Sequence, residues 1–175
     1  MAPTVLTRYP AGNCSPVGVL GKVDCGAATR SPVEEDDVKK SADELADRYV
    51  AVWNEPDADV RRKTVEELWT EDGVHLLEPP EEIVKRADEI GVAAILEARG
   101  HDDLYRRVTR AYDEFVAPGQ FVFRRHGDVA ALSDMVKLRW AMMPADGEEV
   151  LAVGIDLLLV TADGRIERDY QFIEA

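Results

Sequence analysis

Residues 150–160, with the sequence VLAVGIDLLLV, constrain the fold more than any other stretch of the chain. They are apolar except for Gly154 and one charged residue, Asp156, a pattern that predicts a β-strand covered on both faces. A carboxylate on such a strand costs several kcal/mol of desolvation unless it has a partner. Asp156 is therefore the first functional candidate, as a general base or hydrogen-bonding acid. The alternative is an ion pair with Arg139 or Arg168 on a sheet surface that faces a second subunit.

The composition indicates one folded domain. The 175 residues carry a formal charge of −14, with 46% hydrophobic and 32% charged residues. This acidity argues against non-specific binding to nucleic acid or anionic membranes, which relies on clustered basic residues. We expect a flexible arm at residues 1–35 and a single domain at residues 36–175. The arm has no continuous apolar stretch that could serve as a secretory signal or cross a membrane, so we expect a cytoplasmic protein. We expect Cys14 and Cys25 in this arm to be free thiols.

The first half of the chain has the spacing of helices. Apolar residues three and four apart predict helices ending near Trp53, starting after Asp57 or Asp59, and running from Gly100 to Phe115. A short helix is predicted at residues 81–90, between short strands at 74–77 and 93–98. From residue 120 onward, Asp-Gly and Gly-Asp turns separate four predicted antiparallel strands, at residues 120–126, 130–143, 149–160 and 166–173. Helices followed by long strands predict an α+β fold.

Several short runs resemble the nuclear transport factor 2-like superfamily, over roughly residues 38–173. They are RYVAVWN at residues 48–54, LWTEDGV at 68–74, Glu78-Pro79, and GRI at 164–166 followed by Tyr170 and Phe172. The resemblance implies a cone: a curved mixed sheet of five to six mostly antiparallel strands wraps around three to four helices, and its mouth opens into an apolar pocket. It also implies a homodimer formed through the sheet. The strand at residues 150–160 is apolar on both faces, so a second subunit is expected to bury the face that the helices leave open.

Members of this superfamily include ketosteroid isomerases, SnoaL-like polyketide cyclases, limonene-type epoxide hydrolases, dehydratases and non-catalytic binding modules. Tyr49 matches the tyrosine that holds an oxyanion in the isomerases. Glu78-Pro79 resembles their Asp-Pro general base, although the strand before it is one residue longer here. The second acid of the isomerases falls on Val153. In the cyclases, the acid lies on the last strand beside an aromatic residue, where this chain has Tyr170-Gln171.

The extra residue before Glu78 leaves two strand registers open, because a slip of one position exchanges the two faces of a strand. Counted from Asp72, His75 and Leu77 point inward. Counted from Pro79, Leu76 and Glu78 point inward. Both His75, as a proton shuttle, and Glu78, as a base, are therefore candidates.

The leading hypothesis is a SnoaL-like enzyme that performs cofactor-independent acid–base chemistry on a mainly apolar or aromatic small molecule. Its predicted catalytic residues are Asp156, Tyr49, His75 and Glu78, and its predicted substrate-binding residues are Trp53, Tyr112, Phe115, Trp140 and Tyr170. No metal site is predicted, because the metal-binding residue types between Asp72 and Asp102 lack a recognised ligand spacing. The alternative is a non-catalytic ligand-binding or dimeric association domain of the same fold.

Overall fold

The computed structural model describes residues 32–174, and side-chain burial is described from Val38 onward. Most of the arm expected at residues 1–35, including Cys14 and Cys25, lies outside the described residues. The first helix begins at Pro32, so the last residues of that expected arm are helical.

The helices form where the apolar spacing predicts them. They are α1 (Pro32–Val52), α2 (Ala58–Leu68), α3 (Glu81–Glu89) and α4 (Gly100–Ala111), which continues into a π-helical turn, η1 (Tyr112–Val116). The Asp57 carboxylate accepts hydrogen bonds from the backbone N–H groups of Asp59 and Val60, and so caps α2. On α1, the predicted apolar face with Tyr49 and Val52 is fully buried.

The strands of the described residues form one mixed sheet in the order β2-β1-β7-β6-β5-β3, with β4 paired to β5. They are β1 (Trp69–Leu77), β2 (Leu96–Arg99), β3 (Phe121–Arg125), β4 (Ala130–Leu132), β5 (Met135–Pro144), β6 (Ala152–Val160) and β7 (Ile166–Glu174). Only the β1–β7 pair is parallel among these neighbours. The predicted α+β fold with a mixed, mostly antiparallel sheet is confirmed.

The sheet has seven strands where five to six were expected. The single strand predicted at residues 130–143 is wrong, because Ser133 takes a left-handed conformation (φ 57°) and turns the chain back on itself. The result is a tight hairpin in which Leu132 of β4 pairs with Met135 of β5.

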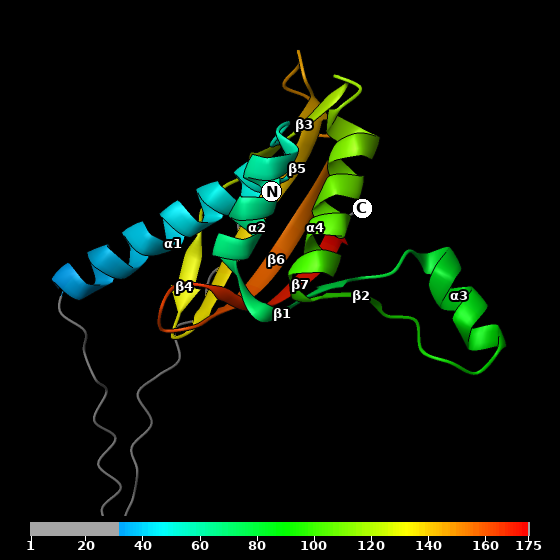
Figure 1. Cartoon of the computed structure of the whole chain (residues 1–175), viewed down its shortest axis with the longest axis horizontal. Coiled ribbons are helices and arrows are strands. Elements are labelled where there is room, and N and C mark those ends of the chain that lie inside the picture. The colour runs from blue at the N-terminus through cyan, green and yellow to red at the C-terminus, as the bar shows by residue number, and fades with distance from the viewer. Residues whose placement is uncertain (1–31, 175) are drawn as a thin grey trace, which may run out of the picture. The chain divides into compact units, whose positions relative to one another are not determined.

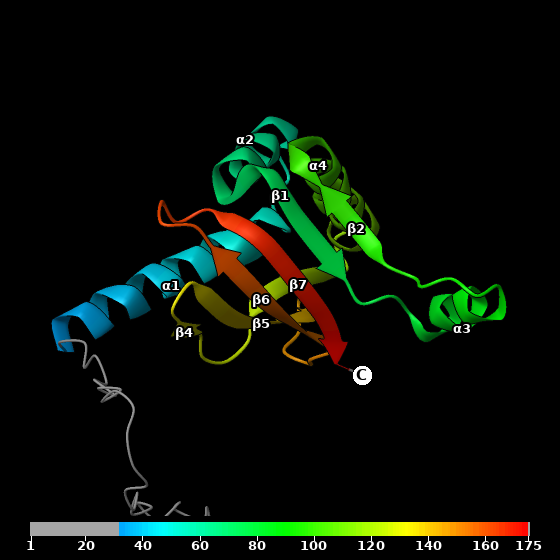
Figure 2. The ribbon, with the colours of Figure 1, turned by 90° about the horizontal axis from the view of Figure 1, so that it is seen from below.

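The core lies between one face of the sheet and helices α1, α2 and α4, whereas no element of residues 32–174 covers the opposite face (Figures 1 and 2). Helix α3 stands away from the sheet at the end of two extended segments in both views, although Pro80 and Ile83 at its start line the internal cavity. No helix in residues 32–174 is both long and apolar enough to cross a membrane.

Strand β1 starts five residues earlier than predicted and pairs with both β2 and β7. Its register with β7 shifts between Trp69 and Val74, and then places His75 beside Asp169. On the other side of β7, Asp156 of β6 pairs with Gln171. Because side chains two residues apart on a strand share a face, Asp156, Asp169, Gln171 and His75 all point toward the helices.

Candidate active site

A cavity of about 640 Å³ opens between the inner face of the sheet, α4 and the start of α3. Most of its wall is apolar or aromatic. The polar side chains that reach it are His75, Glu78, Arg107, Arg110, Glu114 and Gln171. Such a cavity is typical of a small-molecule site, where apolar walls hold the ligand and a few polar groups orient it.

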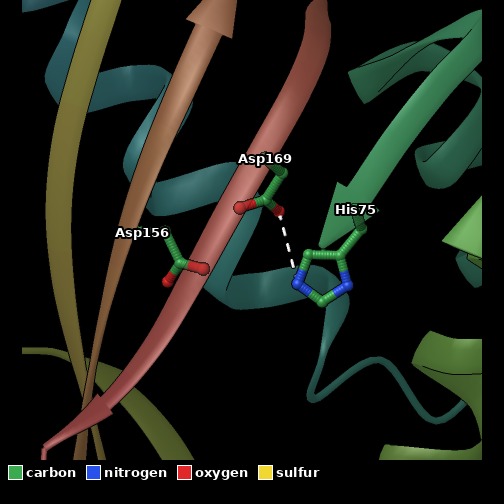
Figure 3. A group of neighbouring side chains, drawn as sticks. All are labelled: His75, Asp156 and Asp169. Atoms are coloured by element: carbon green, nitrogen blue, oxygen red, sulfur yellow. Dashed lines mark ion pairs between the residues drawn. The ribbon is translucent and has the colours of Figure 1, made fainter. Parts of the chain in front are cut away.

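Beneath His75 lies a group of three fully buried side chains: Tyr49, Asp156 and Asp169. The Tyr49 hydroxyl oxygen lies 3.0 Å from Asp156 Oδ1 and 2.7 Å from Asp169 Oδ2. Figure 3 shows Asp156 of β6, Asp169 of β7 and His75 of β1 pointing toward one another from three neighbouring strands. The long helix α1 supplies Tyr49, so the group connects the first helix to the centre of the sheet.

These contacts require a proton on one of the two carboxyl groups. A phenol has a single proton to donate, so only one of the two short contacts can be a hydrogen bond donated by Tyr49. In the other, a protonated carboxyl group donates to the Tyr49 oxygen. Burial and the nearby charge of Asp156 hold the pKa of Asp169 well above its ordinary value. The shared proton is therefore assigned to Asp169.

Asp156 is the ionised member of this pair at neutral pH. Burial raises its pKa to about 6, while the hydrogen bond from Tyr49 favours the charged form and works against this rise. Burial and the two acids raise the pKa of Tyr49 well above 10, so its hydroxyl stays neutral. The direction of hydrogen bonding is therefore from Asp169 to Tyr49, and from Tyr49 to Asp156.

His75 links this buried group to the cavity wall. Arg107 Nη1 lies 3.1 Å from His75 Nδ1, and because an arginine can only donate, Nδ1 must be the accepting nitrogen. The ring proton then sits on Nε2, which lies 3.7 Å from Asp169 Oδ2. That distance is too long for a hydrogen bond. Burial and the charge of Arg107 lower the pKa of His75 to about 3, so the imidazole is neutral.

Three polar atoms of this site have no hydrogen-bond partner among the described residues: His75 Nε2, Asp156 Oδ2 and Asp169 Oδ1. A nitrogen and two carboxylates are ligands that zinc accepts, and one donor atom from each residue lies within 4.8 Å of the others. Sequence reasoning placed no metal here, because these three residues lie far apart in the chain. A small side-chain movement that brings His75 Nε2 within hydrogen-bonding distance of Asp169 Oδ1 would give both of these atoms a partner without a metal.

The cavity gathers several of the predicted site residues. His75, Glu78, Trp53, Phe115 and Trp140 all line it. Glu78 is exposed, so its carboxylate lies at the rim, whereas His75 is 1% exposed and faces the interior. The register counted from Asp72 is therefore the observed one.

Asp156 and Tyr49 do not line the cavity, because they lie behind His75. The expectation that the Tyr49 hydroxyl points into the pocket is wrong, since its oxygen is held by two carboxyl groups. The alternative role for Asp156, an ion pair with Arg139 or Arg168, is also absent from the described residues. Arg139 binds Glu174 instead, and Arg168 lies on the opposite face of the sheet, across the strand ladder from Leu159.

Two predicted substrate-binding residues lie elsewhere. The ring of Tyr112 packs against the Arg61 guanidinium, 4.6 Å from the ring centroid, and does not line the cavity. Tyr170 sits between Asp169 and Gln171 on β7, and because those neighbours point inward, Tyr170 faces outward. Helical and strand spacing identified these aromatic residues but not the face that each one occupies.

Sequence reasoning missed Asp169 and Arg107. The acid expected on the last strand beside Tyr170 is present, but it precedes the aromatic residue instead of following it. Arg107 follows Arg106 in an Arg-Arg pair, a pattern that indicates a solvated helix face. Its spacing of three residues from Leu104 and four from Ala111 places it on the inner face of α4, and this signal was available in the sequence.

The fold is similar to that of known SnoaL-like proteins. A candidate isomerase of the SnoaL-like family from Agrobacterium tumefaciens superposes with a TM-score of 0.62 at 22% identity, over 78% of this chain and 99% of that chain. A SnoaL-like protein of unknown function from Burkholderia thailandensis superposes with a TM-score of 0.55 at 15% identity, over 78% of this chain and 98% of that chain. A nuclear transport factor 2-like protein of unknown function from Mesorhizobium loti superposes with a TM-score of 0.53 at 20% identity, over 80% of this chain and 96% of that chain.

The sequence itself matches no protein-family model and has no significant match among curated proteins. The structural similarity rests on low sequence identity, so it concerns the fold alone. The strand order, the inner helices and these similarities agree with one another, and the described part of the chain therefore has the nuclear transport factor 2-like fold in its SnoaL-like form.

Proposed function

We propose that this protein is an enzyme that performs cofactor-independent acid–base chemistry on a mainly apolar small molecule bound in the cavity. The observation that carries the proposal is the position of His75. It lies on the cavity wall and also faces two buried carboxyl groups that Tyr49 bridges. A cluster of buried titratable groups at a cavity is the usual arrangement of a general acid–base site.

In this proposal, substrate binding releases the Arg107 contact to His75 Nδ1, and this nitrogen then exchanges a proton with the substrate. The carboxyl pair stabilises the charge that develops on the imidazole. Asp156 supplies a buried negative charge, and Asp169 supplies a proton that can move within the group. Trp53, Phe115 and Trp140 hold the apolar body of the substrate. Glu78, at the rim of the cavity, contacts the substrate as it enters. A proton transfer of this kind suits an isomerase, cyclase or dehydratase that acts on a carbon next to a carbonyl group, and a hydrolase that activates water.

The second candidate is a non-catalytic ligand-binding domain. One observation favours it: Tyr49, Asp156 and Asp169 do not line the cavity, and both ring nitrogens of His75 face protein groups. In that case the carboxyl pair would only hold α1 against the sheet. The two candidates differ in whether a bound carbonyl compound exchanges protons.

The test is deuterium exchange of small apolar ketones and enones in D₂O, followed by NMR. The wild-type protein is expected to accelerate exchange of the α-protons of at least one compound. His75→Gln is expected to reduce that acceleration by about a hundredfold or more, since general acid–base groups contribute about 10² to 10⁴. His126→Gln, which changes a histidine near the β3 turn, serves as the matched control. Equal exchange by wild type and His75→Gln would favour the ligand-binding domain.

We also propose a homodimer formed through the outer face of the sheet. On β6, Val153, Ile155, Leu157 and Leu159 alternate with the buried inner residues and are only partly covered. Phe172 on the neighbouring strand is 43% exposed. An exposed apolar row of this kind, flanked by charged residues on β5 and β7, is typical of an interface with a second subunit.

A further inference from the structure

The arginine that contacts His75 has an unusual environment. Arg107 lines the cavity and is about half-buried. Its Nη1 lies within hydrogen-bonding distance of His75 Nδ1 (3.1 Å), the His75 carbonyl oxygen (3.3 Å) and the Leu96 carbonyl oxygen (3.2 Å). These contacts fix the guanidinium against β1 and β2. Its Nε and Nη2 make no hydrogen bond to the described residues, so two or more N–H donors remain available.

Arg107 also lacks a carboxylate partner among the described residues. Many of the more exposed arginines have one within 4.0 Å: Arg48, Arg62, Arg99, Arg106, Arg110, Arg125, Arg139 and Arg165. Burial lowers the pKa of Arg107, although it remains a cation. The charges of Asp169, Asp103 and Glu97 act against this fall, but none of these acids forms an ion pair with Arg107. Asp103 and Glu97 pair with Arg106 and Arg99 instead. The cavity wall thus carries a partly desolvated positive charge with no carboxylate of the described residues within ion-pair distance.

The rest of the cavity does not neutralise this charge. Around Arg107 the wall consists mainly of apolar and aromatic side chains, among them Trp53, Leu96, Phe115 and Trp140. At the rim, Glu114 lies 3.8 Å from Arg110. An unpaired guanidinium in an apolar cavity favours a ligand with a planar anionic group, because such a group forms two parallel hydrogen bonds with the guanidinium fork.

We propose that the cavity binds an apolar molecule bearing one carboxylate, or a comparable anionic oxygen group, and that Nε and Nη2 of Arg107 hold this group. The inference rests on the proposed function, since it names the substrate class of the same cavity. The apolar body of the molecule then lies against Trp53 and Trp140, and its reactive carbon lies close to His75.

This arrangement places the ligand next to the acid–base group. Burial is the larger cause of the low pKa of His75, and the charge of Arg107 is the second. A ligand carboxylate on Arg107 offsets only the second cause. The main role of the anionic group is thus to position the substrate beside His75.

The test compares naphthoate with naphthamide, two planar molecules of nearly equal shape that differ in charge. Calorimetric titration of the full chain is expected to show at least tenfold tighter binding of naphthoate. Arg107→Gln is expected to remove this preference by weakening naphthoate binding at least tenfold, with naphthamide binding changed by less than threefold. Arg110→Gln changes an exposed arginine on the same helix, at the rim of the cavity. This variant is expected to keep the preference for naphthoate.

Naphthamide binding and far-UV circular dichroism report whether Arg107→Gln keeps its fold, and the wild-type preference needs no variant at all. Equal affinities in the wild type, an unchanged preference in Arg107→Gln, or no binding of either compound at millimolar concentration would each overturn the inference. The deuterium-exchange test can succeed on neutral ketones whatever the result here. A carboxylate preference alongside unchanged exchange in His75→Gln would reject the catalytic proposal but keep the carboxylate site.

Discussion

At the residue scale, Asp156 and Asp169 determine how the site responds to pH. Both carboxyl groups have a raised pKa in the folded protein, so the folded state binds more protons than the unfolded state in the acidic range. The contribution of these two groups to stability is then highest at low pH and falls as the pH rises. For Asp156 this loss occurs between its unfolded pKa near 4 and its folded pKa of about 6.

Asp156→Asn should therefore change stability in a pH-dependent way. Relative to the wild type, we expect the variant to gain up to about 3 kcal/mol between pH 4 and pH 7, because asparagine has no charge to bury and a pKa unit corresponds to about 1.4 kcal/mol. Urea unfolding at several pH values measures this difference. Asp163→Asn, an exposed acid in a turn, is the control and should not show a gain of this kind. A constant difference across the pH range would contradict the assignment of Asp156.

Tyr49→Phe should destabilise the folded protein, since the Tyr49 hydroxyl bridges two buried carboxyl groups. Removing one hydrogen-bonding partner from buried polar groups costs about 1 to 3 kcal/mol for each group left unsatisfied. We expect a loss of at least about 2 kcal/mol in unfolding free energy, measured by urea denaturation. Tyr112→Phe keeps the ring that packs on Arg61 and should change stability by less than about 0.5 kcal/mol. Similar losses in both variants would argue against the bridge.

At the element scale, strand β6 and strand β5 fit together through Gly154 and Trp140. A Cβ atom at position 154 would lie 2.2 Å from the Trp140 ring, which is far closer than any allowed contact. The space beside Gly154 is filled by Trp140, whose ring also lines the cavity.

Gly154→Ala is therefore expected to displace Trp140 and to destabilise the protein by about 1 to 3 kcal/mol, the usual cost of overpacking a core. Thermal unfolding measures the loss. The double variant Gly154→Ala with Trp140→Phe should recover part of it, because the smaller ring vacates the position that the new Cβ needs. If the two changes simply add, the close contact is not the cause.

The way that helices and strands are specified explains which parts of the site could be predicted from the sequence. Apolar spacing and Asp-Gly turns located most helices and strands, since these signals are local. The functional group depends on pairing between distant strands. Asp169 lies in the run IERDYQFIE, where polar and apolar residues alternate irregularly, and only the register of β7 with β1 and β6 shows that it faces inward. The proton shared through Tyr49 could not be predicted, because it depends on distances between three elements.

At the scale of the whole molecule, the uncovered outer face of the sheet should set the oligomeric state. Leu157 lies near the middle of this face, between Lys137 of β5 and Tyr170 of β7. We expect the wild-type chain to form dimers at micromolar concentration, measured by size exclusion with light scattering. Leu157→Lys should shift the protein to monomers, because the lysine charge would have to be buried in the interface. Ile90→Lys, at a residue 71% exposed at the end of α3, is the control that should stay dimeric. A monomeric wild type would contradict this expectation.

Two buried carboxyl groups, joined by Tyr49, share one proton beside a neutral His75. The most direct measurement is a pH titration of the aspartate side-chain carbons by ¹³C NMR, with Asp169→Asn used to assign the signals. We expect Asp156 to ionise near pH 6 and Asp169 to lose its proton only at a higher pH than Asp156. If both carboxyl groups are ionised at pH 5, the proton assignment and the acid–base role built on it are wrong.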